Sequence, residues 1–182
     1  MFFKIWVSAI FVSLASGCAS TPDWDTRTPE EKATSTKEIS SVLAGDYIVA
    51  DARNEVFLMH DFKNAKFASL RQNAEGKAAI VTLTDQRGKR ITMISSSCQG
   101  YTKGIKDNNR FEIVCGTPPD SVISSFSMSV AQEDRQIRSG AILPVHTPME
   151  VRKGDYVLNF FEARSGKPHY YILRKVDSPA RQ

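Results

Sequence analysis

The chain contains three cysteines, and their spacing limits the chemistry that they can do. Cys18 follows an apolar amino-terminal stretch, whereas Cys98 and Cys115 lie in the second half of the chain. In an oxidising compartment an even pair of cysteines is most simply a disulfide. The pair is not a C-x-x-C motif, which disfavours redox catalysis, and too few ligands lie nearby for a metal site. We therefore predict a structural Cys98–Cys115 bridge, whose closed loop would contribute roughly 3 kcal/mol.

The other residues with reactive side chains form no catalytic set. His60, His146 and His169 are widely separated and show none of the ligand spacings of zinc sites. The chain also lacks a Gly-rich phosphate loop and a G-x-S-x-G nucleophile elbow. The serines of Ser95–Ser97 are typical of the polar face of a strand rather than of a nucleophile. The sequence thus predicts no enzyme, no cofactor and no metal. An envelope hydrolase, or a metal enzyme in which two histidines meet, is the weakest hypothesis.

The first 17 residues have the order of features of a secretory signal. Lys4 precedes an apolar run from Ile5 to Leu14 that only two serines interrupt, and three small residues follow it. The run is too short to cross about 30 Å of hydrocarbon, which takes about 20 residues. We expect residues 1–17 to be removed on export.

The segment Ala15-Ser16-Gly17-Cys18 resembles the lipobox of bacterial lipoproteins, with Ala at the position where Leu is commonest. The resemblance implies that the Cys18 thiol carries diacylglycerol and that the new amino terminus is acylated as well. Two chains suffice for stable anchoring. Ala19 stands where inner-membrane lipoproteins of many Gram-negative bacteria carry Asp, so the resemblance implies the outer membrane. We expect the domain to face the periplasm. The alternative is a plain signal peptide cut beside a free cysteine.

Length and charge set the domain organisation. Removal of 17 of the 182 residues leaves 165, which suits one domain with a core of its own. The 24 Lys and Arg exceed the 20 Asp and Glu slightly and without clustering. This balance supports weak attraction to anionic lipid, but no basic run with interleaved aromatics indicates nucleic-acid binding. We expect a mobile tether over residues 18–27 and a single domain over 28–182.

One helix and many strands are predicted within that domain. Thr28 as N-cap, Pro29, Glu31 and a terminating Gly45 mark the helix. Its apolar stripe is partial, so it would pack by its second half, and the alternative is that Thr34–Ser41 remains linker. The predicted strands cover 47–50, 56–60, 79–84, 90–94, the two arms of the cysteine hairpin, 122–130, 156–163 and 169–176.

The connections between these strands include turns and two ambiguous stretches. A turn is expected at Asp51–Asn54 and another at Asp85–Gly88. The stretch 61–73 fits either a helical turn or a strand, and 142–151 holds two prolines and fits an edge strand or a loop. In 122–130 the alternation with serines predicts one wet face. The pattern predicts a mainly β fold, an antiparallel barrel or sandwich of about eight strands with one N-terminal helix.

The start of the β region adds a second resemblance. Leu43-Ala44-Gly45-Asp46-Tyr47 resembles the Gly-x-aromatic opening of lipocalin-like barrels, with Tyr47 in place of the family's Trp. This resemblance implies a barrel whose floor the aromatic ring plugs, and a small apolar ligand inside it.

The hypothesis that we favour is a non-catalytic interaction module. An anchored, disulfide-bonded domain without a catalytic set is suited to dock onto another envelope protein or a cell-wall component. The alternative is a lipocalin-like carrier of a small apolar ligand. In Phe160-Phe161 and Tyr170-Tyr171 one ring of each pair should point inward and the other outward, where it could contact a partner.

Overall fold

A computed structural model describes residues 25–54, 64–73, 78–101, 111–137, 148–163 and 168–176. Cys18, the predicted strand over 56–60, His60 and His146 lie outside these ranges. The described elements are α1 (Pro29–Leu43), β1 (Gly45–Asn54), β2 (Ala65–Gln72), β3 (Ala79–Asp85), β4 (Arg90–Ile94), β5 (Ser97–Tyr101), β6 (Phe111–Gly116), β7 (Ile123–Val130), β8 (Arg135–Ile137), β9 (Met149–Val151), β10 (Tyr156–Glu162) and β11 (Pro168–Lys175).

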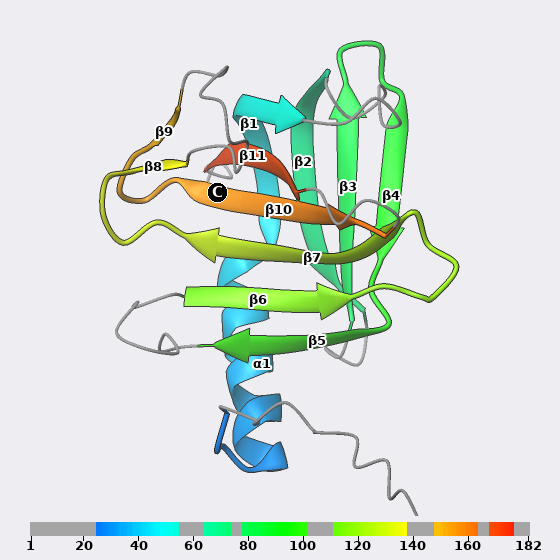
Figure 1. Cartoon of the computed structure of the whole chain (residues 1–182), viewed down its shortest axis with the longest axis vertical. Coiled ribbons are helices and arrows are strands. Elements are labelled where there is room, and N and C mark those ends of the chain that lie inside the picture. Colours follow the sequence, from blue (N-terminus) through cyan, green and yellow to red (C-terminus); the bar gives the residue numbers. More distant parts are fainter. Residues whose placement is uncertain are drawn as a thin grey trace, which may run out of the picture.

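Nine of these strands form one curled antiparallel sheet, a half-barrel with the order β4-β3-β2-β1-β11-β10-β7-β6-β5 (Figure 1). β8 and β9 pair with each other in a separate two-stranded ribbon. The helix α1 packs mainly against β5 at one edge of the large sheet. The prediction of a mainly β, antiparallel fold with one N-terminal helix is confirmed.

The helix begins where the sequence predicts. The Thr28 hydroxyl accepts from the Glu31 amide at 3.2 Å, and the Glu31 carboxylate accepts from the Thr28 amide at 2.7 Å, which completes a capping box before Pro29. The buried positions Ile39 and Leu43 belong to the second half of α1. The stretch Thr34–Ser41 is therefore helix and not linker, because this half packs on the sheet.

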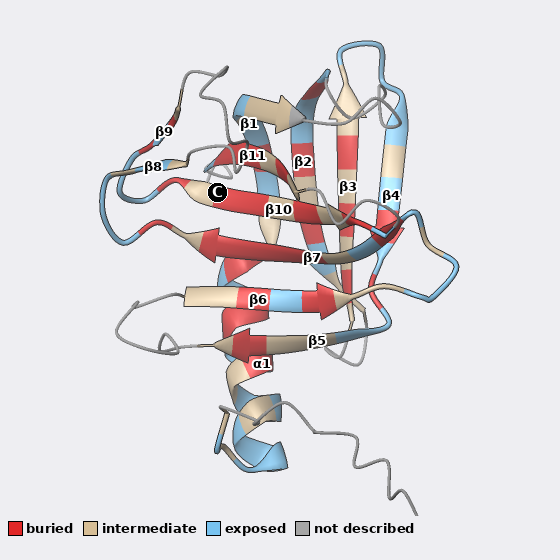
Figure 2. Ribbon diagram, in the orientation of Figure 1, coloured by how far each residue is buried: buried red, intermediate tan, exposed pale blue. Residues whose placement is uncertain are grey.

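Side chains from α1 and from the inner face of the sheet fill the interior of the half-barrel. The rings of Phe126 and Phe160 lie 6.1 Å apart, and those of Phe160 and Tyr171 lie 5.7 Å apart. Tyr47 is buried where α1 meets β1, and its hydroxyl donates to the Leu43 carbonyl. Burial raises the pKa of Tyr47, so it remains a neutral donor. Figure 2 shows how β7 and β10 are mostly buried while β4 is mostly accessible.

The predicted turn at Asp51–Asn54 is wrong. β1 continues through these residues and pairs with β11 from Asp51 opposite Ile172 to Asn54 opposite His169. An irregularity between Val49 and Asp51 shifts the register and absorbs the extra residue. The long-range pairing therefore prevails over the local turn propensity of these polar residues.

Other connections follow the predictions more closely. The ambiguous stretch 61–73 contains the strand β2, and Gly88, with φ of 80°, closes the predicted β3–β4 hairpin. The proline-containing stretch 142–151 ends in the three-residue strand β9. The predicted wet face of β7 is wrong, because Ser127 and Ser129 are buried.

Candidate functional site

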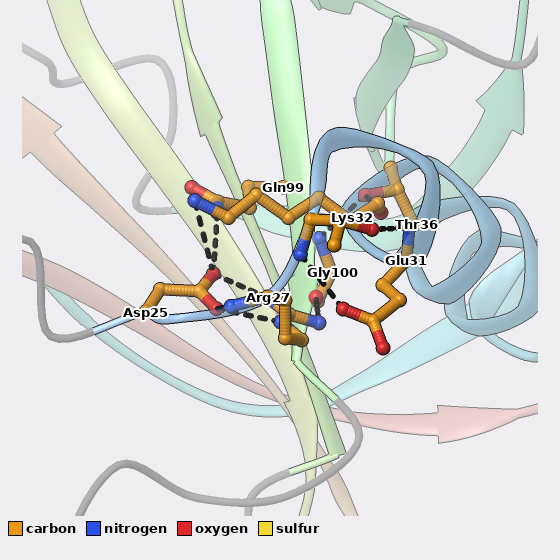
Figure 3. A network of polar contacts seen from close by, with 8 residues as sticks. Asp25, Arg27, Glu31, Lys32, Thr36, Gln99 and Gly100 are labelled. Atoms are coloured by element: carbon orange, nitrogen blue, oxygen red, sulfur yellow. Dashed lines mark hydrogen bonds and ion pairs between the residues drawn. The ribbon is translucent and has the colours of Figure 1, made fainter.

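A network of charged and polar side chains fixes the residues just before α1 to the edge strand β5 (Figure 3). Two nitrogens of Arg27, Nε and Nη2, each lie 2.7 Å from an oxygen of the Asp25 carboxylate. The same carboxylate accepts a 2.7 Å hydrogen bond from Gln99, and Arg27 Nη1 donates to the Gly100 carbonyl at 2.8 Å. We call Asp25, Arg27, Gln99 and Gly100 the N-terminal clamp.

The clamp is partly sheltered from solvent. The Asp25 side chain is 9% exposed and the Arg27 side chain 23%. The hydrogen bonds from Arg27 lower the pKa of Asp25 from 3.8 to about 2, and the same pair raises the pKa of Arg27. Lys32 adds a third charge, 3.9 Å from the Asp25 carboxylate. The carboxylate thus remains ionised at any ordinary pH and holds the clamp together.

The clamp differs from the predicted mobile tether over residues 18–27. Asp25 and Arg27 belong to that range, yet both are hydrogen-bonded to β5. No local pattern signals this contact, because the partner of Arg27 lies 73 residues away. The chain therefore enters the domain at the α1–β5 end, which lies opposite the β3–β4 turn along the long axis of the molecule (Figure 1).

A glycine permits the close approach of α1 to β5. The Gly100 amide donates to the Thr36 hydroxyl at 2.8 Å. A Cβ added at Gly100 would lie 2.7 Å from the Thr36 Cα and 2.8 Å from the Ser35 carbonyl oxygen. Any larger residue here would push the helix backbone away from the strand.

The predicted Cys98–Cys115 disulfide is confirmed. The two cysteines are directly opposed on β5 and β6, with Cα atoms 4.1 Å apart. Ser95, the first residue of the serine triplet, is buried and accepts a 2.7 Å hydrogen bond from the Ala79 amide. Its hydroxyl also lies 3.1 Å from the Cys98 sulfur. These contacts give Ser95 a structural role and brace the strand that carries the clamp.

A half-open groove of about 940 Å³ runs between α1 and the β5–β6 hairpin. Lys32 and Lys37 of the helix line it opposite Gln99 and Tyr101 of β5. The Arg27 guanidinium lies 5.0 Å from the centre of the Tyr101 ring. Basic side chains therefore gather at the end of the domain from which the tether would leave.

The outer face of β1–β4 forms a broad accessible surface. Its side chains follow from the strand register in three cross-strand rows, Ile48–Phe67–Thr84–Arg90, Asp46–Ser69–Thr82–Thr92 and Arg71–Ile80–Ile94. We call these eleven residues the outer β1–β4 face. Ile48 and Phe67 are directly opposed and are 50% and 53% exposed. The β8–β9 ribbon covers part of the neighbouring strands of the sheet. Within the described part of the chain, no element covers the outer β1–β4 face in the same way.

Polar groups surround the exposed apolar pair. Arg71 and Asp46 form an ion pair at 2.6 Å, and the Thr82 and Thr92 hydroxyls lie 3.2 Å apart. A shallow hollow of about 440 Å³ lies among Asp46, Phe67 and Thr84. An apolar centre with a polar rim is the usual anatomy of a protein interface. The alternation of Val81 and Leu83 with Thr82 and Thr84 predicts a core face and a polar face for β3, but it does not predict the exposed Ile48–Phe67 pair.

The remaining predicted residues are placed as follows. Tyr171 and Phe160 point into the core and their neighbours Tyr170 and Phe161 point outward, as predicted. His169 is buried. Among the described residues, no group of three or more His, Cys, Asp or Glu could hold a metal ion.

Comparisons with known proteins found no match: no family model, no curated protein and no solved structure matches the chain. In the described part of the chain, α1 is not long and apolar enough to cross a bilayer.

Proposed function

We propose that this protein is a lipid-anchored, non-catalytic interaction module of the bacterial envelope, which docks another envelope protein or a cell-wall component onto its outer β1–β4 face. The observation that carries the proposal is the exposed, directly opposed pair Ile48 and Phe67 on that face. Contiguous exposed apolar side chains with a polar rim mark interaction sites.

The proposed anchor is the lipid on Cys18, in the outer membrane and on its periplasmic side. Cys18 precedes Asp25 by seven residues, a span of at most about 25 Å when extended. Because the clamp fixes Asp25 to β5, the α1–β5 end of the domain would stay near the bilayer. Lys32 and Lys37 at this end would be attracted to anionic headgroups. The β3–β4 turn, at the opposite end, would reach away from the membrane.

The packing of the interior favours docking over the lipocalin-like carrier. A carrier needs a cavity inside the barrel, whereas among the described residues buried side chains from α1 and the sheet pack together in that space. The groove beside α1 and the hollow among Asp46, Phe67 and Thr84 instead open at the surface. Tyr47, which the lipocalin resemblance would place as a floor plug, contacts Leu43 and Tyr156 within this packed core.

Site-specific photocrosslinking in intact cells tests the proposed face. A photoreactive residue at Phe67 is expected to give discrete crosslinked species of higher mass. Val122, an apolar residue that is 59% exposed between β6 and β7, serves as the matched control position and should give none. A second variant, with the photoreactive residue at Ile48 and Phe67→Ser, should lose the product obtained at Ile48 alone. Equal products from Phe67 and Val122, or none from Ile48 and Phe67, would contradict the proposal.

A further inference from the structure

A separate cavity lies on the outer face of the other half of the sheet, beneath the β8–β9 ribbon. Met149 and Val151 of the ribbon pack against Val157 and Ile172 and form a small second core. Beside this core, β8 leaves a cavity of about 300 Å³ open to solvent at one side. Ligand pockets range from about 300 to 1,000 Å³, so this one is of a size for a small molecule.

The strand register places the polar groups that line the cavity. Glu112, Ser129 and Val157 are cross-strand neighbours, and so are Ser127, Asn159 and Tyr170. Arg135, Gln136 and Ile137 of β8 lie over them. Opposed side chains on one sheet face have Cβ atoms about 5 Å apart. The cavity therefore gathers several polar groups within reach of one small ligand.

Two polar atoms of the cavity lining are buried without a hydrogen-bond partner. The Asn159 Oδ1 and Arg135 Nε atoms are inaccessible and have no hydrogen-bond partner in the described residues. Ser127 and Ser129 are only 9% and 8% exposed. An unsatisfied buried polar group costs roughly 1–3 kcal/mol, and water or a ligand that reached these atoms after a small shift of the lining side chains would remove that cost. Apolar side chains at these positions, in continuation of the second core, would have avoided this cost.

We infer that this cavity binds a small neutral saccharide. Arg135 can only donate hydrogen bonds, the Glu112 carboxylate can only accept them, and the serine hydroxyls can do both. A sugar hydroxyl also donates and accepts, so a polyol can satisfy all of these groups at once. An anionic ligand would face Glu112, and a cationic one would face Arg135. The Tyr170 ring and Val157 supply apolar surface for the carbon framework of a sugar.

Calorimetric titration of the purified full-length protein with glucose and with N-acetylglucosamine tests the inference. At least one of the two sugars is expected to bind at millimolar concentration. Asn159→Leu removes the amide at similar volume and should weaken binding about tenfold or more. It should not lower the thermal midpoint, because an unsatisfied buried group is removed. Ser124→Ala, which removes an exposed hydroxyl from β7 outside the cavity, should leave the affinity unchanged.

Ser129→Ala provides a second variant if Asn159→Leu fails to fold, and it should weaken binding in the same direction. Failure of both sugars to bind would overturn the inference and leave a water-filled cavity. Binding of glycine in place of the sugars, or equal affinity in all variants, would overturn it as well. Because the cavity and the outer β1–β4 face involve different strands and residues, either result leaves the docking proposal to its own test.

Discussion

The contact between α1 and β5 makes a quantitative prediction at Gly100. A methyl group introduced by Gly100→Ala would lie 2.7 Å from the Thr36 Cα and 2.8 Å from the Ser35 carbonyl oxygen. Both obstructing atoms belong to the helix backbone, so no side-chain rotation can relieve the clash. Overpacking of this kind costs about 1–3 kcal/mol. Displacement of the helix would also break the 2.8 Å hydrogen bond from the Gly100 amide to Thr36, worth about 1 kcal/mol.

We therefore expect Gly100→Ala to lower the free energy of unfolding by roughly 2–4 kcal/mol. For a domain of this size the loss corresponds to a fall in Tm of roughly 4–16 °C. Urea unfolding and a thermal melt of the same samples would measure it. The matched control is Gly116→Ala on the adjacent strand β6, where the atom nearest to an added Cβ is the Ser97 hydroxyl oxygen at 3.7 Å. That variant should stay within about 0.5 kcal/mol of the parent protein.

Equal stability of the two glycine variants would refute the reasoning. It would mean that α1 does not rest on β5 at the distance that the structure gives. A loss at Gly116 larger than the loss at Gly100 would be an equally clear contradiction.

Two further predictions concern the same end of the domain. Replacement of both cysteines, Cys98→Ala with Cys115→Ala, should lower the free energy of unfolding in urea by about 3 kcal/mol, and a loss below about 1 kcal/mol would count against a structural bridge. The depressed pKa of Asp25, 3.8 lowered to about 2, contributes stability that is present above pH 4 and disappears as the pH falls toward 2. This shift corresponds to at most ~2.5 kcal/mol, and solvent screening reduces it to about 1 kcal/mol. The parent protein should exceed Asp25→Asn by that amount at neutral pH and lose the advantage in acid, whereas a difference independent of pH would exclude the clamp as its source.

Much of the fold could be predicted from local sequence patterns. The capping box before Pro29, the alternation in β3 and β4, and the opposed cysteines each express a physical preference over a few residues. The turn predicted at Asp51–Asn54 failed because pairing with β11 outweighs local turn preference. The prediction of a wet face at Ser127 failed for a similar reason, since the ribbon that covers it comes from a distant part of the chain.

The candidate surfaces were harder to predict. The N-terminal clamp joins Arg27 to β5 across 73 residues, and a polar stretch without periodicity shows no sign of it. The outer β1–β4 face depends on which strands are neighbours, and the order of the sheet cannot be deduced from alternation alone. The unsatisfied Asn159 Oδ1 and Arg135 Nε atoms could not be predicted from the sequence, because they are buried only when β8 lies over β10 in the folded chain.

The anchor on Cys18 is the premise on which the whole functional proposal depends. The most direct test is labelling of cells with radioactive palmitate, followed by fractionation of the parent protein and of Cys18→Ser. We expect the parent protein to carry label and to sediment with membranes, while Cys18→Ser carries none and appears in the soluble periplasmic fraction. Labelling that persists in Cys18→Ser, or a parent protein that is unlabelled and soluble, would contradict it.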